Sequence, residues 1–442
     1  MTRKNKEVDI EKRYRFPDSI KVIRHKGNII IVSPETGNWI VLKNDNQLDF
    51  FESLKNLTIK EAISGFSGSE NDIREVITQI EAKQFDDLTV NKITSKRLHL
   101  YLTNACNLRC LHCYMFAGEK NEKELTTEEV FSLLDKFKQF GGEAVTFSGG
   151  EICMRTDLFP IIKYANELKL DVQLMTNGTL WTDELISKIA PLVSNVQISI
   201  DGYSEEENAL IRGKDNFGKA LDTCDKFVKC CKSVQVAITP LYTEKIEEKS
   251  TEYATFGKML WEKHKDSSFK VIFSSELLDG REVSLTADQK LKYKQYIDLI
   301  YKKCFGNVSD VSFAESRKKK EIMDSCSFGS LTVSSNGDVY FCGRIPFLGK
   351  VANIRSDSFQ RIMNLSEKAI KCTNVNNLKP CNHCELKYIC GGGCRIDYFP
   401  KLTSCTDIEN LNVDDIPPRQ CSEKVKYEFY DLMLRTNEMI YQ

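Results

Sequence analysis

The chain has 442 residues, of which 41% are hydrophobic, 28% charged and 10% aromatic, a composition that excludes collagen-like and wholly disordered proteins and suits several globular domains. The 62 Lys and Arg residues nearly balance 63 Asp and Glu residues, giving a net charge of −1 and disfavouring a general nucleic-acid-binding surface. No apolar run approaches the roughly 18 residues of a membrane span, and the first residues lack the apolar core of a secretory signal. We therefore expect a cytoplasmic protein without a membrane or nucleic-acid partner.

Residues 1–90 are predicted to form a separate unit. Apolar segments at 19–25, 28–34 and 38–44 predict three short strands, with glycine turns between them. Three helical patterns follow, in which apolar residues recur three or four positions apart. Three strands followed by three helices predict a winged-helix-like domain, with a polar linker after it.

Strands and helices alternate over residues 91–300. The predicted strands are 98–103, 144–148, 172–176, 196–200, 234–239 and 269–275. The first helix between them has a capping box of Thr126 and Glu129 and a stop at Gly141. This alternation predicts parallel strands with right-handed crossovers, and six units suffice for a partial (βα)6 TIM-like barrel of the α/β class. In such folds the chemistry lies at the carboxyl ends of the strands.

Residues 301–442 show weak periodicity but many cysteines, out of 17 in the whole chain. A cytosolic compartment keeps thiols reduced, so clustered cysteines favour metal ligation over disulfides. We therefore expect a cysteine-rich domain held by metal. Its last segment, residues 424–440, is predicted to be a helix that covers the protein with Val425, Phe429, Leu432 and Leu434.

The first cysteine group is Cys106-x3-Cys110-x2-Cys113, directly after the first predicted barrel strand. Zinc sites usually combine pairs of ligands into a tetrahedron, whereas three thiolates in one short loop fit three corners of a [4Fe–4S] cube. The fourth iron then remains open to a ligand from outside the protein. The alternative is a zinc knuckle completed by His112 or a distant cysteine.

This motif, with the aromatic Tyr114 after it, resembles that of the radical S-adenosylmethionine (radical SAM) superfamily. Further matches follow at successive strand ends: Gly149-Gly150-Glu151 resembles the GGE motif that holds the methionine amino group, and Asn177, Ser199, Asp201 and Arg212 stand at similar positions further on. The resemblance implies that S-adenosylmethionine is bound by these residues: Tyr114, Gly149, Gly150, Glu151, Asn177, Ser199, Asp201 and Arg212. It also implies that a low-potential cluster cleaves S-adenosylmethionine to a 5′-deoxyadenosyl radical, which removes hydrogen from a substrate.

The later cysteines resemble the SPASM domain, which carries two auxiliary [4Fe–4S] clusters, so that the resemblance implies three clusters in all. By position, Cys326, Cys342 and Cys394 would ligate auxiliary cluster I, and Cys381, Cys384, Cys390 and Cys421 auxiliary cluster II. Cluster I then has three obvious ligands. The candidates for the fourth are Cys304, Cys372 and Cys405, and the alternative is that the protein supplies none. An open iron there would suit a substrate thiolate. The alternatives are Cys405 in place of Cys421, and a pair of zinc sites.

The N-terminal unit resembles the RiPP recognition element, a domain that binds the leader of a ribosomally made precursor peptide. That domain takes the peptide as an added strand at a sheet edge, next to a helix. The alternative is a structural cap or a dimerisation domain.

These features predict a radical SAM/SPASM peptide maturase that forms a thioether or carbon–carbon crosslink in a leader-bearing precursor peptide. An external electron donor of the flavodoxin or ferredoxin type is expected. The rival functions are a sulfatase-maturing oxidase, which makes formylglycine from Cys or Ser, and a zinc-ribbon scaffold or regulatory protein. No catalytic acid or base is assigned. Four carboxylates are near enough in sequence to approach the site: Glu276, Asp279, Glu282 and Asp338.

Overall fold

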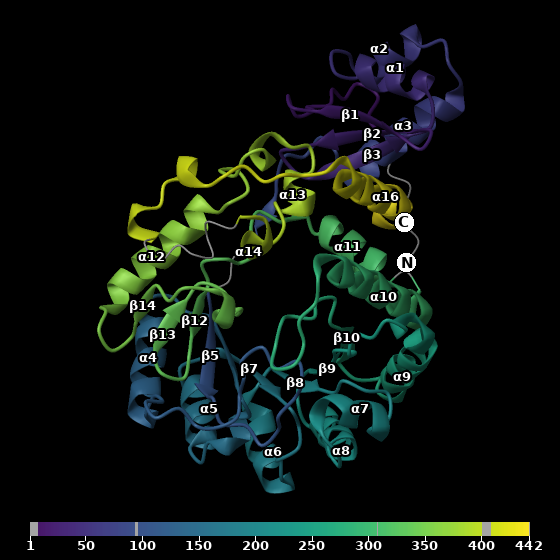
Figure 1. The fold of residues 1–442 in the computed structure, drawn as a ribbon. Coiled ribbons are helices and arrows are strands. Elements are labelled where there is room, and N and C mark those ends of the chain that lie inside the picture. Colours follow the sequence, from purple (N-terminus) through teal and green to yellow (C-terminus); the bar gives the residue numbers. More distant parts are fainter. Residues whose placement is uncertain (1–7, 93–95, 307, 400–407, 442) are drawn as a thin grey trace.

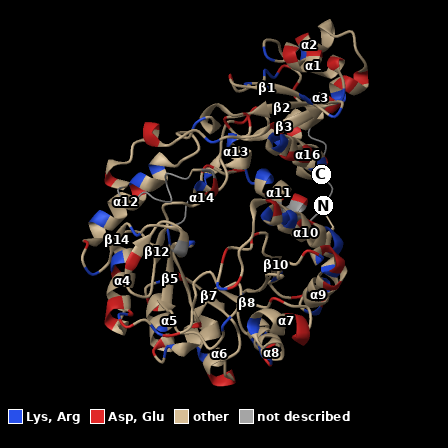
Figure 2. Ribbon diagram, in the orientation of Figure 1, with Lys and Arg blue, Asp and Glu red and all other residues tan. Residues whose placement is uncertain are grey.

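The computed structural model describes residues 8–92, 96–306, 308–399 and 408–441. Figure 1 shows a small N-terminal unit that lies beside the C-terminal helix, and a larger sheet surrounded by helices. Acidic and basic residues are interspersed over the outer helices, as Figure 2 shows, in agreement with the near-zero net charge. Within these described residues, no helix is long and apolar enough to cross a membrane.

The N-terminal unit contains a three-stranded antiparallel sheet in the order β1-β2-β3. The strands are β1 (Lys21–His25), β2 (Asn28–Ser33) and β3 (Asn38–Leu42), followed by α1 (Asp45–Ser53), α2 (Ile59–Gly65) and α3 (Glu70–Lys83). The sheet is apolar on both faces. Ile31 and Ile40 pack with Phe51 on the side of the unit's own helices, whereas Val32 and Trp39 pack against the C-terminal part of the chain. The unit is therefore joined to the rest of the protein by an apolar interface.

The central sheet has nine strands in the order β10-β9-β8-β7-β6-β5-β12-β13-β14. Its six parallel strands are β5 (Arg97–Thr103), β6 (Ala144–Gly149), β7 (Asp171–Thr176), β8 (Asn195–Ser199), β9 (Val234–Ile238) and β10 (Phe269–Phe273). All six predicted strands are confirmed to within two residues at each end. Successive strands pair with one another in parallel, which confirms the predicted α/β partial barrel.

Helices follow the strands of this barrel. They are α4 (Thr127–Gln139), α5 (Leu158–Glu167), α6 (Asp183–Ile189), α7 (Glu205–Arg212), α8 (Phe217–Val228), α9 (Ser250–Lys263) and α10 (Ala287–Phe305). The predicted capping box of Thr126 and Glu129 is present at the start of α4, and Gly141 follows its end with a φ of +80°. The proposed domain boundary at residue 300 falls inside α10.

The C-terminal region extends the barrel sheet. Its elements are α11 (Val308–Lys318), β11 (Glu321–Ile322), β12 (Leu331–Val333), β13 (Asp338–Tyr340), β14 (Ala352–Asn353), α12 (Phe359–Cys372), α13 (Lys387–Cys390), α14 (Arg395–Tyr398) and α16 (Glu423–Tyr441). β12 pairs in parallel with β5, β13 and β14 follow as antiparallel strands, and β11 pairs with β4 (Asn91–Lys92). Pairing of β12 covers an edge of β5 that would otherwise be open.

The short 3₁₀ segments are η1 (Ile152–Met154), η2 (Ala190–Leu192), η3 (Ile246–Lys249), η4 (Ile345–Phe347), η5 (Cys381–His383), η6 (Ile408–Asn410) and η7 (Val413–Asp415).

The C-terminal helix forms where it was predicted, but with a different buried face. Its buried positions are Tyr430, Met433, Thr436, Asn437 and Ile440, whereas the predicted Val425, Phe429, Leu432 and Leu434 are only half-buried. The reason is that α16 packs against α11 as well as against β3 and α3. Its buried face therefore includes polar residues that an apolar stripe does not reveal.

Candidate functional site

The first cysteine loop begins where β5 ends, and backbone contacts fix its shape. The Cys106 N–H donates to the Gly118 carbonyl and the Gly118 N–H to the Asn104 carbonyl, both at 2.8 Å, which closes the loop at its base. Two backbone N–H groups, those of Leu108 and Ala117, point at the sulfurs of Cys106 and Cys113 at 3.4 Å. Such donors stabilise thiolates, the form in which cysteine ligates iron.

The three thiols of this loop interact electrostatically with one another, and burial raises the pKa of Cys110 to about 11 and also raises that of Cys106. Metal binding releases the thiol protons, so these raised values describe the metal-free loop. Among the described residues, no three His, Cys, Asp or Glu side chains already have the spacing of a metal site, so metal binding requires the loop to bring its thiols together. Three cysteines in one loop, with N–H donors to two of the sulfurs, suit a cluster that has three protein ligands.

The Gly149–Glu151 segment supports this loop from β6. A Cβ atom on Gly150 would lie 2.2 Å from the Ala105 carbonyl oxygen, and one on Gly149 would lie 2.3 Å from that of Thr103. The Glu151 N–H donates to the Ala105 carbonyl at 2.8 Å. Only glycines permit this approach, so the two glycines hold the backbone directly before Cys106 in place.

The Glu151 side chain points into the protein. Its carboxylate is fully buried and accepts hydrogen bonds from the Thr176 hydroxyl and the Asn177 N–H, both at 2.7 Å, and from the Cys153 N–H at 3.2 Å. Burial raises its pKa, against these hydrogen bonds. The structure thus places Glu151 as a positioning residue between β6 and β7, rather than with its carboxylate towards a ligand amino group. The Asn177 side chain in turn lies 3.9 Å from the Cys106 sulfur.

A second buried carboxylate, Asp201, organises the end of β8. Its Oδ2 is 2.7 Å from Nε2 of His112 and accepts from Nε of Arg212, and its Oδ1 accepts from the Thr239 N–H at 3.1 Å. Although burial raises the pKa of this carboxyl, Arg212 and His112 outweigh that effect and hold the pKa at about 2. Asp201 is therefore an anion that orients His112, within the cysteine loop, and Arg212.

A cavity of about 440 Å³ opens at the carboxyl ends of β8, β9 and β10. Of the predicted S-adenosylmethionine ligands, Tyr114, Ser199 and Arg212 line it. The other five predicted ligands, Gly149, Gly150, Glu151, Asn177 and Asp201, are not in its lining. Asp201 bonds the wall residues His112, Arg212 and Thr239. The cavity is polar enough and large enough for a ligand with charged and hydroxyl groups.

Sequence reasoning missed several side chains of this cavity. His112 appeared only as a zinc ligand, and Gln197 and Thr239 not at all, yet all three line the wall. The signal was present in the alternation along β8 and β9, where every second residue faces the interior of the barrel. Of the four carboxylates considered, only Glu276 lines the cavity, while Asp338 is held in a hairpin far along the sheet.

The division of the later cysteines into two groups stays a prediction. Of the first group, Cys342 interacts with Cys326. Arg395 interacts with Cys326 and Cys394 and also with Cys381 and Cys390, so it lies between the two predicted groups. Arg344 interacts with Cys394, bonds Asp397 at 2.8 Å and pairs with Glu276 of the cavity. This arginine therefore connects the first SPASM-like group to the cavity wall.

The second group surrounds a cavity of about 260 Å³, lined by Cys381, Cys384, Cys390 and Cys421. The Cys384 sulfur accepts from the Leu386 N–H at 3.4 Å, and burial raises the pKa of this thiol to about 12. Four thiols around one apolar cavity fit a four-ligand cluster.

Three successive glycines, 391–393, have φ values of +64°, +77° and +71°. This left-handed turn separates Cys390, which lines the pocket, from Cys394.

Two of the candidates for a fourth ligand of the first group, Cys304 and Cys372, are buried. Cys304 lies on α10 near Gly257, and Cys372 lies on α12, with its thiol towards the Leu411 carbonyl at 3.7 Å. Both pack in the apolar core. Cys405 lies outside the described residues.

The two cysteine regions are connected by a pair of tyrosines. The Tyr101 hydroxyl donates to the Gly343 carbonyl at 2.8 Å and lies 3.1 Å from the Tyr114 hydroxyl. Tyr114 follows Cys113, and Gly343 follows Cys342. Burial raises the pKa of both tyrosines, which keeps them neutral hydrogen-bonding groups.

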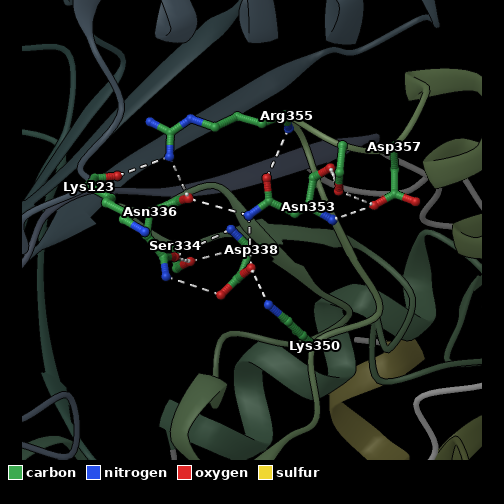
Figure 3. A network of polar contacts seen from close by, with 9 residues as sticks. Lys123, Ser334, Asn336, Asp338, Lys350, Asn353, Arg355 and Asp357 are labelled. Atoms are coloured by element: carbon green, nitrogen blue, oxygen red, sulfur yellow. Dashed lines mark hydrogen bonds and ion pairs between the residues drawn. The ribbon is translucent and has the colours of Figure 1, made fainter.

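The hairpin of β13 and β14 is anchored to the barrel by Arg355 (Figure 3). Its guanidinium bonds the Glu129 carboxylate at 2.6 and 2.7 Å and the carbonyls of Lys123 and Asn336 at 3.1 and 3.2 Å. Asp338 bonds Asn353 at 2.8 Å and Lys350 at 3.1 Å, as Figure 3 shows. These contacts fix the strand that leads to Cys342.

Comparison with known families agrees with this geometry. Residues 100–252 match the Radical SAM superfamily, and residues 325–385 match SPASM, an iron-sulfur cluster-binding domain. The chain therefore contains a radical SAM domain followed by a SPASM domain. These domains imply a [4Fe–4S] cluster that works with S-adenosylmethionine in the barrel, and auxiliary clusters in the C-terminal region.

Among individual proteins, the chain is 31% identical to mycofactocin maturase MftC of Mycolicibacterium smegmatis, over 36% of this chain and 42% of that protein. It is 28% identical to the AdoMet-dependent heme synthase of Methanosarcina barkeri, over 66% of this chain and 89% of that protein. The sporulation killing factor maturation protein SkfB of Bacillus subtilis is 33% identical over 32% of this chain and 34% of that protein.

Thus the chain spans less than half of the first and third of these relatives. Among solved structures, anSMEcpe with bound AdoMet has a TM-score of 0.55 at 18% identity, covers 78% of this chain and 98% of that protein, and so shares its fold.

Proposed function

We propose that this enzyme modifies a ribosomally made precursor peptide by removing a hydrogen atom from one of its residues, and that it forms a thioether or carbon–carbon crosslink. The observation that carries the proposal is that the loop of Cys106, Cys110 and Cys113 borders a 440 Å³ cavity through His112 and Tyr114, in a chain that also has the later cysteines of a SPASM domain. Relatives named as a maturase and a maturation protein support a peptide substrate.

In this proposal Cys106, Cys110 and Cys113 hold the cluster, and Tyr114, Ser199 and Arg212 contact S-adenosylmethionine. When bound, these groups supply a 5′-deoxyadenosyl radical. Asp201 keeps Arg212 and His112 fixed, and Glu151 fixes the backbone beside Asn177. The barrel wall and the apolar core behind it keep water from the reacting carbon.

For a thioether, a C–H and an S–H bond break and a C–S bond forms. One hydrogen atom goes to the 5′-deoxyadenosyl carbon, the thiol proton goes to solvent, and one electron remains for an iron–sulfur centre. An external donor of the flavodoxin or ferredoxin type supplies the electron that starts each turnover.

The N-terminal unit is proposed to bind the leader of the peptide. Its order of three strands and three helices is the arrangement expected of a leader-binding domain, with an extended peptide added at a sheet edge.

The test is anaerobic incubation of the iron-loaded protein with dithionite, S-adenosylmethionine and the short peptide encoded beside its gene. We expect 5′-deoxyadenosine, together with a peptide that has lost two hydrogen atoms. A Cys106→Ala/Cys110→Ala/Cys113→Ala variant should form neither product. A Cys230→Ala variant, changed at an exposed cysteine just after α8, should form both.

Three further readouts separate the products. A thioether removes one alkylatable thiol, a carbon–carbon bond removes none, and formylglycine reacts with a hydrazide. Cofactor cleavage that leaves the peptide unchanged but yields heme would instead support the activity named for the Methanosarcina barkeri relative, an AdoMet-dependent heme synthase.

A further inference from the structure

The outer edge of β3 is closed by side chains. In an edge strand, alternate residues direct their backbone N–H and C=O groups away from the neighbouring strand, where they can pair with another chain. In β3 these residues are Trp39 and Val41, with Lys43 directly after the strand. The outward backbone groups with which an incoming strand would pair already form hydrogen bonds with side chains of this protein.

Gln79 of α3 occupies the centre of this edge. Its side-chain oxygen accepts from the Val41 N–H at 2.9 Å, and its side-chain nitrogen donates to the Val41 carbonyl at 2.6 Å. One primary amide thus makes the donor and acceptor pair that a residue of an added strand would make. Gln79 is buried, and so is its partner Val41.

The flanking edge groups are closed in the same way. The Lys83 ammonium donates to the Trp39 carbonyl at 2.8 Å, and the Lys43 N–H donates to the side-chain oxygen of Gln47 at 2.8 Å. Lys83 is buried, and its ammonium lies 5.0 Å from the centre of the Trp39 ring. The closure therefore extends along the whole of β3.

The C-terminal helix holds these closing side chains. Asn437 of α16 donates to the Gln79 side-chain oxygen at 3.1 Å and accepts from the Lys83 ammonium. One turn earlier on the same helix, the Met433 carbonyl accepts from the Trp39 indole N–H at 3.1 Å. Asn437 thus connects α16 to both residues that close the edge.

Space for rearrangement lies next to this contact. A cavity of about 520 Å³ is bounded by β3, α3 and α16, and its wall includes Val41, Gln79 and Asn437. A displaced Gln79 side chain can therefore move without entering the apolar core.

We propose that Gln79, Lys83 and Asn437 form an intramolecular latch in which α16 keeps the β3 edge closed to an incoming peptide strand. The inference rests on the proposed function, since the strand it excludes is the extended precursor peptide. Gln79 is the group that such a strand replaces. Asn437 sets how readily this exchange happens.

The test is backbone hydrogen exchange of the segment 38–43 in the full-length protein, combined with binding of the peptide encoded beside the gene. Asn437→Ala removes the polar contact of α16, while alanine preserves the helix. We expect exchange in this segment to rise about ten- to hundredfold, the effect of losing two buried hydrogen bonds, and peptide affinity to rise by a similar factor. Glu428→Ala, at an exposed position on the same helix, is the matched control and should change neither.

Gln79→Ala is the second variant, and it removes the side chain that closes the edge while leaving the residues of α16 unchanged. It should accelerate exchange at Val41 even if Asn437→Ala proves unstable. Unchanged exchange in these variants overturns the latch, and so does faster exchange with unchanged peptide affinity. Faster exchange with no peptide binding to any form, wild type included, supports the latch and instead counts against leader binding by this unit.

Discussion

Replacement of Asp201 by Asn is expected to loosen the end of β8. Asn keeps the size of the side chain but removes the charge that pairs with Arg212 and His112. Arg212 is then left as a buried cation, because only 11% of its side chain is exposed. Loss of one partner from a buried ion pair usually costs about 3–5 kcal/mol.

A second argument gives a similar magnitude. The Asp201 pKa is lowered from 3.8 to about 2, which corresponds to roughly 2 kcal/mol in favour of the charged form in the folded protein. We therefore expect a local destabilisation of about 2–4 kcal/mol. This equals a roughly 30- to 1000-fold acceleration of hydrogen exchange wherever the local opening is limited by this contact.

The assay is hydrogen exchange by mass spectrometry on the iron-free protein, read over the segments 195–212 and 234–239. Asp183→Asn is the control, because Asp183 forms an ion pair with Lys226 at 2.7 Å but is 80% exposed. Exposed pairs contribute at most about 1 kcal/mol, so this control should change exchange by no more than a few-fold.

A double variant, Asp201→Asn/Arg212→Met, adds a sharper criterion. It removes the unpaired cation and should regain part of the lost protection. Equal exchange in wild type and Asp201→Asn, or a double variant less protected than the single one, would refute the role given to the buried pair.

Three other outcomes are expected. Gly150→Ala should prevent iron loading of the first cysteine loop, because the new Cβ would lie 2.2 Å from the Ala105 carbonyl oxygen. Iron analysis should then show a loss of roughly four iron atoms per chain. The control Gly218→Ala, which has open space around its new Cβ, should load iron normally. Cys421→Ala should likewise lower iron and sulfide content by one cluster, and an unchanged content would favour another ligand. The pKa of Glu129 is lowered to about 2, mainly by Arg355, so this pair contributes stability that is complete above pH 4.5 and lost as the pH falls towards 2. Because both groups are about one-third exposed, Arg355→Met should remove only about 1 kcal/mol of unfolding free energy at pH 7 and nothing near pH 2. Thermal unfolding across that pH range measures this difference.

The barrel could be predicted from the sequence because each of its strands is a short apolar run followed by an amphipathic helix. The capping box at Thr126 and the buried stripe from Val130 to Phe137 follow local rules, and the structure contains both. The strands β12, β13 and β14 could not be predicted, since two or three residues show no periodicity. Their place beside β5 depends on pairing over more than 200 residues of chain.

The site was predictable in its residue types more than in its geometry. Motif spacing selected Glu151 and Asp201, but only the structure shows that both carboxylates are buried and bonded to protein groups. His112 is the converse case: its neighbours along the chain suggest a metal ligand, whereas its hydrogen bond to Asp201 depends on β8, 89 residues away. The buried face of α16 was misjudged for a related reason, because Asn437 is buried by its partners on α3 rather than by apolar contact.

The helix α16 has 19 residues and is therefore about 28 Å long. It starts two residues after Cys421, helps to wall the four-cysteine pocket through Val425 and Phe429, and ends against the N-terminal sheet. Because α16 contacts both the pocket and the N-terminal sheet, a tilt of this helix at one end also moves its other end. If binding in the four-cysteine pocket stabilises the packing of α16, it changes the affinity of the N-terminal sheet for its ligand. Ligand binding at the sheet must then change the affinity of the pocket by the same factor, because thermodynamic linkage is reciprocal.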